Sequence, residues 1–195
     1  MTPEVASIVW LFGGIGWYVI RFPYQRRNRR KNTVVQSQFD LRENILLGCS
    51  LSGLAVVPLI YVFTGWLSFA DYSFHWLQGV LGTAVMAAAL WMFHLSHRDL
   101  GRNWSVSLEL RDSHNLVTEG SYRYVRHPMY TAFWLLALAQ ALLLPNVIAG
   151  LAGVVGFGML FFGRIDREES MMLAVFGDEY RQYMRRTARV FPKIY

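Results

Sequence analysis

Five blocks of apolar residues, separated by polar segments, constrain the fold of this chain more than any other feature. They run over residues 5–20, 45–69, 74–95, 129–144 and 147–163 and carry few or no charges. The second and third blocks reach the roughly 20 residues that an α-helix needs to cross a bilayer. Only 16% of all residues are charged, against roughly 25% in soluble domains. The sequence therefore predicts an all-α integral membrane protein with about five transmembrane helices.

The last two apolar blocks are short and lie close together along the chain. They contain 16 and 17 residues, which gives about 24 to 26 Å of helix at about 1.5 Å per residue. Pro145-Asn146 between them fits a tight turn, since Pro lacks a backbone donor and Asn tolerates unusual dihedral angles. We therefore expect an antiparallel helical hairpin over residues 129–163.

The basic residues predict the orientation in the membrane. All 19 fall outside the apolar blocks, with seven in residues 21–44, five in residues 96–128 and seven from residue 164 onward. The N-terminus and the turns at 70–73 and 145–146 hold none. Because positive residues stay on the cytoplasmic side, we expect the N-terminus outside and the C-terminus in the cytoplasm.

Other readings of the charge and of the metal-ligating residue types are weaker. The net charge of +6 and the basic run at residues 26–31 would suit nucleic acid, but the run directly follows an apolar block. We read it as a topology signal that contacts anionic headgroups, with no nucleic-acid partner. Glu4 stands where a signal peptide would be positive, so the first block is expected to be a retained anchor. Cys49 is the only cysteine, and the histidines show no metal-ligand spacing, so no metal site is expected.

Two polar clusters flank the predicted hairpin, at residues 126–130 and 164–169. An antiparallel hairpin brings both clusters to the same, cytoplasmic face. The connection over residues 100–128 leads into the first cluster. A connection of this length without helical periodicity is uncommon unless it is functional or disordered, and its many aromatic residues argue against disorder. We expect it to fold over a site.

The segment after the fifth block has an apolar stripe at helical spacing, from Ile165 to Tyr183. Glu169 falls inside this stripe, and Glu168 lies at its edge, one turn after Arg164. A carboxylate on a buried face is costly unless it is paired or hydrogen-bonded, so we predict a site role for Glu169. For Glu168, a surface pair with Arg164 worth about a few tenths of a kcal/mol explains the position as well as a site role does.

Three blocks of residues in this half of the chain share a fixed order and spacing. They are His114-x-Leu116-Val117-x-x-Gly120-x-Tyr122-x-x-Val125-Arg126-His127-Pro128-x-Tyr130, then Arg164-x-x-x-Glu168-Glu169, then Phe176-Gly177-x-x-Tyr180-x-x-Tyr183. Together they resemble the isoprenylcysteine carboxyl methyltransferase family, which is related to the membrane phospholipid N-methyltransferases. The resemblance covers about residues 100–192, half of the chain.

The resemblance implies an enzyme that transfers a methyl group from S-adenosylmethionine, releasing S-adenosylhomocysteine, to a lipophilic acceptor at the cytoplasmic membrane face. The implied acceptor is the carboxylate of an isoprenylcysteine-like molecule, either small or part of a prenylated protein. The implied catalytic residues are Arg164, Glu168 and Glu169. The implied cofactor-binding residues are His114, Leu116, Val117, Gly120, Tyr122, Val125, Arg126, His127, Pro128, Tyr130, Glu168 and Tyr180.

The expected organisation is one membrane domain, residues 1–195. Residues 1–95 would form three N-terminal spans, and residues 96–195 the catalytic region. In that region the cytoplasmic loop and an amphipathic C-terminal helix over residues 164–187 would form the cofactor pocket beside the hairpin.

Several residues of the first block have two readings. Tyr122 and Tyr130 suit stacking on adenine or a cation–π contact with the sulfonium, but they also suit an interfacial aromatic belt. Pro128 can start a helix, where its missing donor costs nothing, and His127 can cap that helix or contact the cofactor. Arg126 or His127 is a candidate partner for the cofactor carboxylate.

The chemistry of the acceptor decides which charged residue is essential. A carboxylate with a pKa of about 4 is already ionised at pH 7, so Arg164 would orient it and Glu168 would hold the guanidinium. An amine acceptor must lose a proton, which would make Glu168 or Glu169 the base. Either glutamate is also a candidate partner for the ammonium or ribose of the cofactor.

Three alternatives to a carboxyl methyltransferase remain open at this level. One is a phospholipid N-methyltransferase. Another is an NADPH-dependent membrane sterol or enone reductase, since such reductases share the Arg-His-Pro-x-Tyr hairpin and a terminal Pro-x-x-Tyr. The third is a membrane scaffold without enzymatic activity, which leaves Glu169 unexplained.

Overall fold

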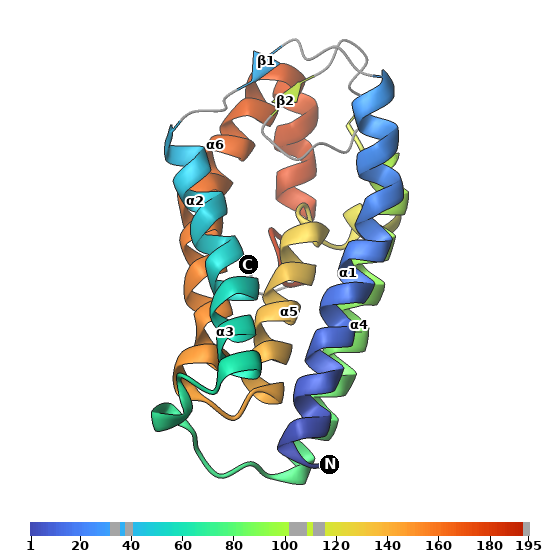
Figure 1. Ribbon diagram of the computed structural model, residues 1–195. Coiled ribbons are helices and arrows are strands. Elements are labelled where there is room, and N and C mark those ends of the chain that lie inside the picture. Colours follow the sequence, from blue (N-terminus) through green and yellow to red (C-terminus); the bar gives the residue numbers. More distant parts are fainter. Residues whose placement is uncertain (32–35, 38–40, 102–108, 111–115, 193–195) are drawn as a thin grey trace.

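The structure is a computed structural model, and Figure 1 shows it as helical rods standing side by side. It describes residues 1–31, 36–37, 41–101, 109–110 and 116–192. The predicted site residue His114 lies outside the described residues.

The rods follow the five apolar blocks in order. Their bounds are α1 Pro3–Lys31, α2 Leu41–Leu51 continued by the π-helix η1 Ser52–Val56 and α3 Val57–Thr64, α4 Trp76–Leu100, α5 Pro128–Leu143 and α6 Val147–Arg186. The connections contain the 3-10 turns η2 Ser68–Ala70 and η4 Gly120–Arg123, and a short antiparallel pair of β1 Gln36–Ser37 with β2 Glu109–Leu110. Helices suit these blocks because a bilayer offers no partners for backbone N–H and C=O groups, which a helix pairs internally.

Four helical stretches of the described chain are long and apolar enough to cross a membrane: Pro3–Arg26, Leu41–Thr64, Trp76–Leu100 and Val147–Arg186. The fifth rod, α5, is shorter, with 16 residues. The predicted all-α integral membrane fold is confirmed.

The rods form two walls that share α5. In the first wall α1 packs against α4, closely enough that a Cβ on Gly13 would lie 2.5 Å from the Met86 sulfur. In the second wall the rod of α2, η1 and α3 packs against α6, where a Cβ on Gly53 would lie 2.1 Å from the carbonyl oxygen of Ala152. Helix α5 contacts both walls. Figure 1 shows α5 between and behind α1 on one side and α2 with α3 on the other.

Helix α6 contains both the fifth apolar block and most of the C-terminal helix expected over residues 164–187. It continues from the membrane span through residue 164 without a break. The charged residues that begin at residue 164 mark a change from apolar to polar surroundings. Such a change does not end a helix, because backbone hydrogen bonding continues. The break comes at Gly177, whose φ of 52° and ψ of −121° are not helical. The chain beyond Gly177 then runs back beside the earlier part of α6 (Figure 1).

A buried polar side chain near the end of α5 ties this helix to the second wall. Gln140 of α5 is 1% exposed, and its amide nitrogen donates to the carbonyl oxygens of Gly53 and Ala149, at 3.0 and 2.7 Å. Gly53 lies in the π-helix η1, where the wider turn changes the backbone pairing. Gln140 therefore fixes the depth at which α5, η1 and α6 meet.

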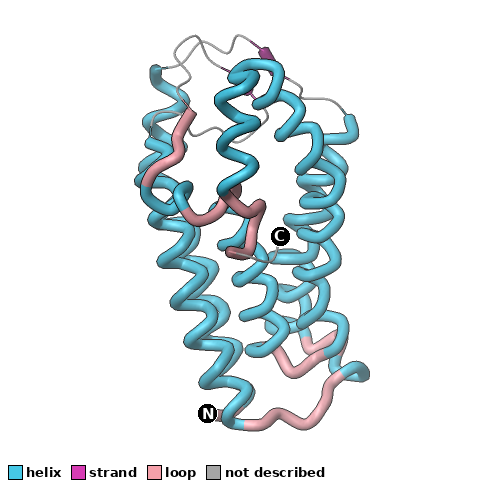
Figure 2. The backbone as a smooth tube through the Cα atoms, turned by 180° about the vertical axis from the view of Figure 1, so that it is seen from behind, coloured by secondary structure: helices cyan, strands magenta, loops and turns pink. Residues whose placement is uncertain are grey.

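The predicted tight turn between the last two spans is confirmed. Asn146 caps α6 by accepting from the Ala149 N–H at 2.8 Å. Its own amide donates to the Leu67 carbonyl at 2.6 Å and to Asp71 at 2.7 Å. This turn therefore also holds the connection between α3 and α4, which lies at the same end of the molecule as the N-terminus (Figure 2).

Candidate active site

The Arg126 to Tyr130 motif is held in place by the C-terminal segment of the chain. The N–H groups of Arg126 and His127 donate to the carbonyl oxygens of Ala188 and Arg189, at 2.7 and 2.9 Å. Helix α5 then begins at Pro128, as predicted, and the His127 side chain makes no capping hydrogen bond. Capping therefore does not explain His127.

Glu169 is buried and fully engaged. Its side chain is 4% exposed, and one oxygen accepts from Nε and Nη2 of Arg126, at 3.0 and 2.9 Å. The other oxygen accepts from Arg189 at 2.7 Å, and His127 Nε2 lies 3.2 Å from the first. The expected cost of a carboxylate in the apolar stripe is thus offset by charged partners. Arg126 also donates to the main-chain oxygens of Met184 and Thr187, which commits all but one of its N–H groups.

Arg164 and Glu168 form a second charged group, together with Glu43 from the start of α2. Arg164 Nη1 lies 3.0 Å from Glu43 Oε1, whereas its Nε lies 3.9 Å from Glu168 Oε2. Glu43 is 1% exposed and Arg164 is 9% exposed. Tyr130 donates to Glu168 Oε2 at 2.5 Å. Glu43 is therefore the nearer partner of Arg164, and Glu168 keeps a partly exposed carboxylate.

The turn η4 brings Tyr122 over the site. Gly120 has a φ of 63°, and a Cβ there would lie 2.4 Å from Asp99 Oδ2, which accepts from the Ser121 N–H at 2.7 Å. Tyr183 donates to the Tyr122 carbonyl oxygen at 2.5 Å. Burial, followed by the charge of Glu168, raises the pKa of the Tyr122 hydroxyl well above its usual range. Tyr122 therefore stays neutral and offers an aromatic ring and a hydroxyl.

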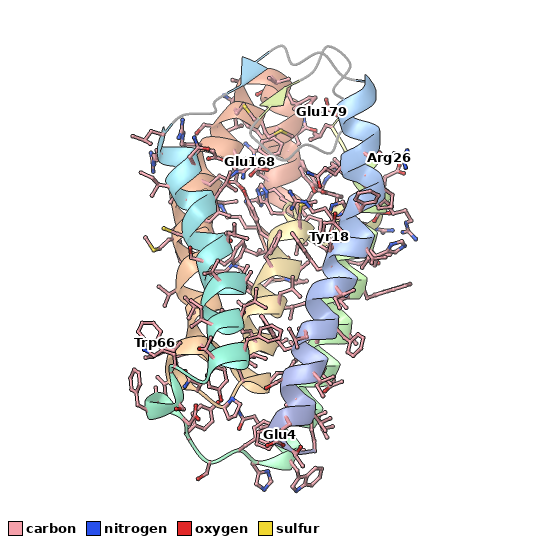
Figure 3. The ribbon with its side chains drawn as sticks, in the orientation of Figure 1. Glu4, Tyr18, Arg26, Trp66, Glu168 and Glu179 are labelled. Atoms are coloured by element: carbon pink, nitrogen blue, oxygen red, sulfur yellow. The ribbon has the colours of Figure 1, made fainter. Side chains whose placement is uncertain are left out.

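A single cavity of about 920 Å³ connects these groups to the membrane interior. Its polar end is lined by Tyr122, Arg126, His127, Tyr130, Arg164 and Glu168. Its apolar arm extends between α1 and the α2–α3 rod and is lined by residues that include Trp10, Gly14, Leu54, Met86, Leu136 and Gln140. Figure 3 shows Glu168 toward one end of the molecule, with Glu4 and Trp66 toward the other. The cavity thus joins a charged chamber to an apolar channel.

The structure brings most of the predicted site residues together. The predicted residues that line the cavity are Leu116, Val117, Tyr122, Arg126, His127, Tyr130, Arg164, Glu168 and Tyr180. Gly120, Val125, Pro128 and Glu169 do not line it. Gly120 forms the turn, Val125 pairs with Ala188, Pro128 starts α5, and Glu169 holds Arg126 in place. These four residues shape the site from behind.

The sequence-based reasoning missed contributions from the first half of the chain and from the end. Glu43 reads as an ordinary acidic residue in the first turn of a helix, where the macrodipole favours it. Trp17 and Arg21 of α1 also line the cavity, with the guanidinium 5.1 Å from the indole ring. The available signal was the position of Arg21, directly after the first apolar block. Nothing in the sequence indicated Arg189 as a partner of Glu169.

Comparison with known proteins agrees with this geometry. Residues 80–174 match the sequence model of the isoprenylcysteine carboxyl methyltransferase family. This part of the chain has the sequence pattern of that family. The match includes both clusters that flank the hairpin, so the resemblance read from three short motifs is confirmed.

Two curated relatives of this methyltransferase family show how far the similarity extends. The protein-S-isoprenylcysteine O-methyltransferase of Schizosaccharomyces pombe is 37% identical over 89 residues, covering 46% of this chain and 38% of the relative. The enzyme of the same name from Rattus norvegicus is 26% identical over 189 residues, covering 92% of this chain and 65% of the relative. The chain therefore spans less than two thirds of either methyltransferase.

A solved member of the family has a similar fold. It is a eukaryotic intramembrane Ras methyltransferase, an isoprenylcysteine carboxyl methyltransferase, with a TM-score of 0.57 and 25% sequence identity. The match covers 80% of this chain and 55% of that one. The similarity thus extends beyond the motif-bearing half to the arrangement of the helices.

Proposed function

We propose that this chain is an S-adenosylmethionine-dependent methyltransferase that acts on the carboxylate of an isoprenylcysteine-like lipophilic acceptor. The observation that carries the proposal is the single cavity, whose charged chamber opens into an apolar channel. Such a shape suits a reaction between a polar donor and a reactant with a long hydrocarbon chain. The names of the curated relatives and of the solved neighbour support the same reaction.

The polar end has the chemistry that S-adenosylmethionine requires. Glu168 lines it with a side chain that is 28% exposed, which leaves a carboxylate for the ammonium or the ribose hydroxyls. The rings of Tyr122 and Tyr180 line the same end and are nearly buried. They suit a sulfonium cation and an adenine through cation–π contact and stacking. When bound, the cofactor supplies an electrophilic methyl group on sulfur.

The residues of this chain would then hold the acceptor and exclude water. The conversion of a carboxylate to a methyl ester moves no proton, so alignment of the reactants is the main requirement. Arg164 lines the polar end and carries a buried Nε without a hydrogen bond, which makes it the candidate for orienting the acceptor carboxylate. We assign Arg126 and Glu169 a positioning role, because each side chain is paired mainly with the other and with residues of the C-terminal segment.

The apolar arm suits the hydrocarbon part of the acceptor. Its lining includes Ile15 and Tyr18 of α1 and Leu51 of α2, which are 57%, 54% and 61% exposed. These side chains flank the cavity from both walls and face outward at membrane depth. An acceptor would enter sideways from the bilayer between α1 and the α2–α3 rod, while the cofactor would enter from the cytoplasm.

The proposed reaction requires that the polar end of the cavity face the side of the membrane where the cofactor is found. The polar end lies with the termini of the helices that carry the basic residues, and the N-terminus lies at the opposite end (Figure 3). Following the positive-inside rule, the proposed orientation has the N-terminus outside and the polar end in the cytoplasm. The water-soluble cofactor is then available where the site needs it.

Calorimetry on the detergent-solubilised full chain tests the proposed function. We expect saturable heat with S-adenosylhomocysteine and none with NADPH. Heat with NADPH alone would overturn the methyltransferase proposal in favour of a membrane reductase. Heat with neither ligand would favour a scaffold without enzymatic activity. Glu168→Gln should weaken S-adenosylhomocysteine binding by about tenfold or more, because it removes a charge-assisted contact. The exposed Glu179→Gln, on the outer part of α6, should leave binding unchanged.

A further inference from the structure

The apolar arm of the cavity ends on a tightly packed cluster of side chains. Trp10 and Met86 line the cavity and belong to this cluster. The other buried members are Ala6, Leu67, Ala139, Leu143, Leu144 and Ala149, and none of them lines the cavity. Trp10 is 8% exposed and Met86 is 5% exposed. These two side chains therefore form the floor of the arm, and the packed cluster lies beneath them.

The floor is held rigidly at one depth. Met86 extends from α4 over Gly13 of α1, where a Cβ would lie 2.5 Å from its sulfur. Gln140 of α5 lines the arm as well, and its hydrogen bonds to Gly53 and Ala149 fix it against the opposite wall. A close-packed interior of this kind does not yield to a longer ligand without cost.

The length of the arm along α5 follows from helix geometry. Pro128 begins α5 at the polar end, and Gln140 lies 12 residues further along the same helix. At about 1.5 Å per residue this is about 18 Å. A hydrocarbon chain attached to an acceptor at the polar end thus has about 18 Å of arm before it reaches the depth of Gln140.

We propose that the floor formed by Trp10 and Met86 sets the longest hydrocarbon chain that the acceptor can carry into the cavity. The inference rests on the proposed function, because it assumes that the acceptor's reacting group lies at the polar end. It identifies Met86 and Trp10 as residues that determine chain-length specificity. Both side chains lie far from the charged residues, so the floor selects among acceptors without taking part in the chemistry.

A second position allows the arm to be shortened, whereas a smaller residue at Met86 would lengthen it. Gly14 of α1 lines the arm, and a Cβ at this position would have no atom within 4 Å. A larger side chain at Gly14 therefore has room to enter the arm without a clash. Gly48 of α2 is matched to it, since a Cβ there also has no neighbour within 4 Å, but Gly48 does not line the cavity.

The experiment compares prenylcysteine acceptors that carry geranyl, farnesyl or geranylgeranyl chains, in both methyl transfer and binding. Met86→Ala should raise the geranylgeranyl-to-farnesyl ratio of kcat/KM by about tenfold, because it makes room to bury roughly two more methylene groups. Gly14→Leu should lower this ratio by about as much. Detectable methyl transfer to the geranyl acceptor shows that the Met86→Ala variant is folded.

Two control variants and one separate outcome complete the design. Gly48→Leu and the half-exposed Met159→Ala, neither of which lines the cavity, should leave the ratio unchanged. An unchanged ratio in both Met86→Ala and Gly14→Leu, with methyl transfer intact, overturns the floor proposal alone. Binding that depends on chain length without methyl transfer to any acceptor supports the floor and overturns the proposed function instead.

Discussion

Arg164 and Glu43 form a buried ion pair between two neighbouring helices of the same wall, α6 and α2. Their 3.0 Å contact holds the guanidinium that we assign to the acceptor. Glu43→Gln removes this charge at nearly constant size, so the guanidinium loses its fixed direction. We expect kcat to fall by about tenfold or more, while S-adenosylhomocysteine affinity stays within about threefold. Radiolabelled methyl transfer and calorimetry measure the two quantities.

Comparison variants separate positioning from general damage. Arg164→Ala should abolish turnover with a similar retention of cofactor affinity, and Glu43→Asp, which keeps the charge, should recover part of the loss. The exposed Arg185→Ala and Glu179→Gln are the matched controls. Normal kcat in Glu43→Gln would show that α2 does not orient Arg164.

At the scale of single residues, the sequence predicted which positions are unusual more reliably than their partners. Helical spacing placed Glu169 on a buried face, and the structure confirms its burial and its pairing. Its partners Arg126 and Arg189 are 43 and 20 residues away, and a helical stripe contains no information on such distant neighbours. For the same reason Glu168 was paired with Arg164 in the prediction, while the nearer Glu43 was missed.

Among the helices, the break in α6 at Gly177 has the clearest consequence for the site. The residues after it supply Tyr180 and Tyr183 to the cavity and lead to the segment that pairs with Arg126. Gly177→Ala would meet no atom within 4 Å, so its cost is backbone strain alone. A non-glycine residue at this positive φ costs about 1 to 3 kcal/mol.

We therefore expect Gly177→Ala to lower the free energy of unfolding by about 1 to 3 kcal/mol. We also expect it to weaken S-adenosylhomocysteine binding, because Tyr180 would be displaced. Denaturant titration in detergent and calorimetry measure these effects. Gly48→Ala, at a helical position with equal space, should be neutral or slightly stabilising. Unchanged stability in Gly177→Ala would mean that α6 continues straight in solution.

The sequence predicted the helices well where hydrophobicity alone determines their position, and less well where a helix bends or ends for another reason. Each apolar block became a helical rod, and Pro145-Asn146 became the turn between α5 and α6. Helix α6 continues through residue 164, where the prediction divides the hairpin from the C-terminal helix, because a change from apolar to charged surroundings leaves backbone hydrogen bonding intact. Gly177 had been noted only as part of a motif, although glycine is the residue that permits its dihedral angles.

For the whole molecule, the proposed orientation can be measured with single cysteines in a Cys49→Ser background. Ser68→Cys lies at the end that holds the N-terminus, and Asp178→Cys lies at the polar end, where the Asp178 side chain is 83% exposed. We expect a membrane-impermeant maleimide to label Ser68→Cys in intact cells, and Asp178→Cys only after the membrane is opened. Both should react in detergent. The reverse pattern would invert the orientation.

Apart from the hairpin of α5 and α6, the packing of the rods was beyond the sequence prediction. Five apolar blocks do not state which rods are neighbours, since lipid tails and other helices are equally apolar. Close approaches at glycines decide it, as at Gly53 against Ala152 and Gly13 against Met86. The cavity lies between two walls. In one wall α1 packs along α4, in the other the α2–α3 rod packs along α6, and α5 contacts both.

The shared position of α5 links two properties that might otherwise vary separately. Its first turn carries Tyr130, which donates to Glu168 of α6, and its last turn carries Gln140, which donates to Gly53 of η1 in the same wall. A substitution that changes the tilt of α5 would alter the width of the lipid entrance and the aim of Tyr130 in one movement. Variation in the sequence of this helix is thus constrained by two demands at once, and acceptor range and turnover should change together.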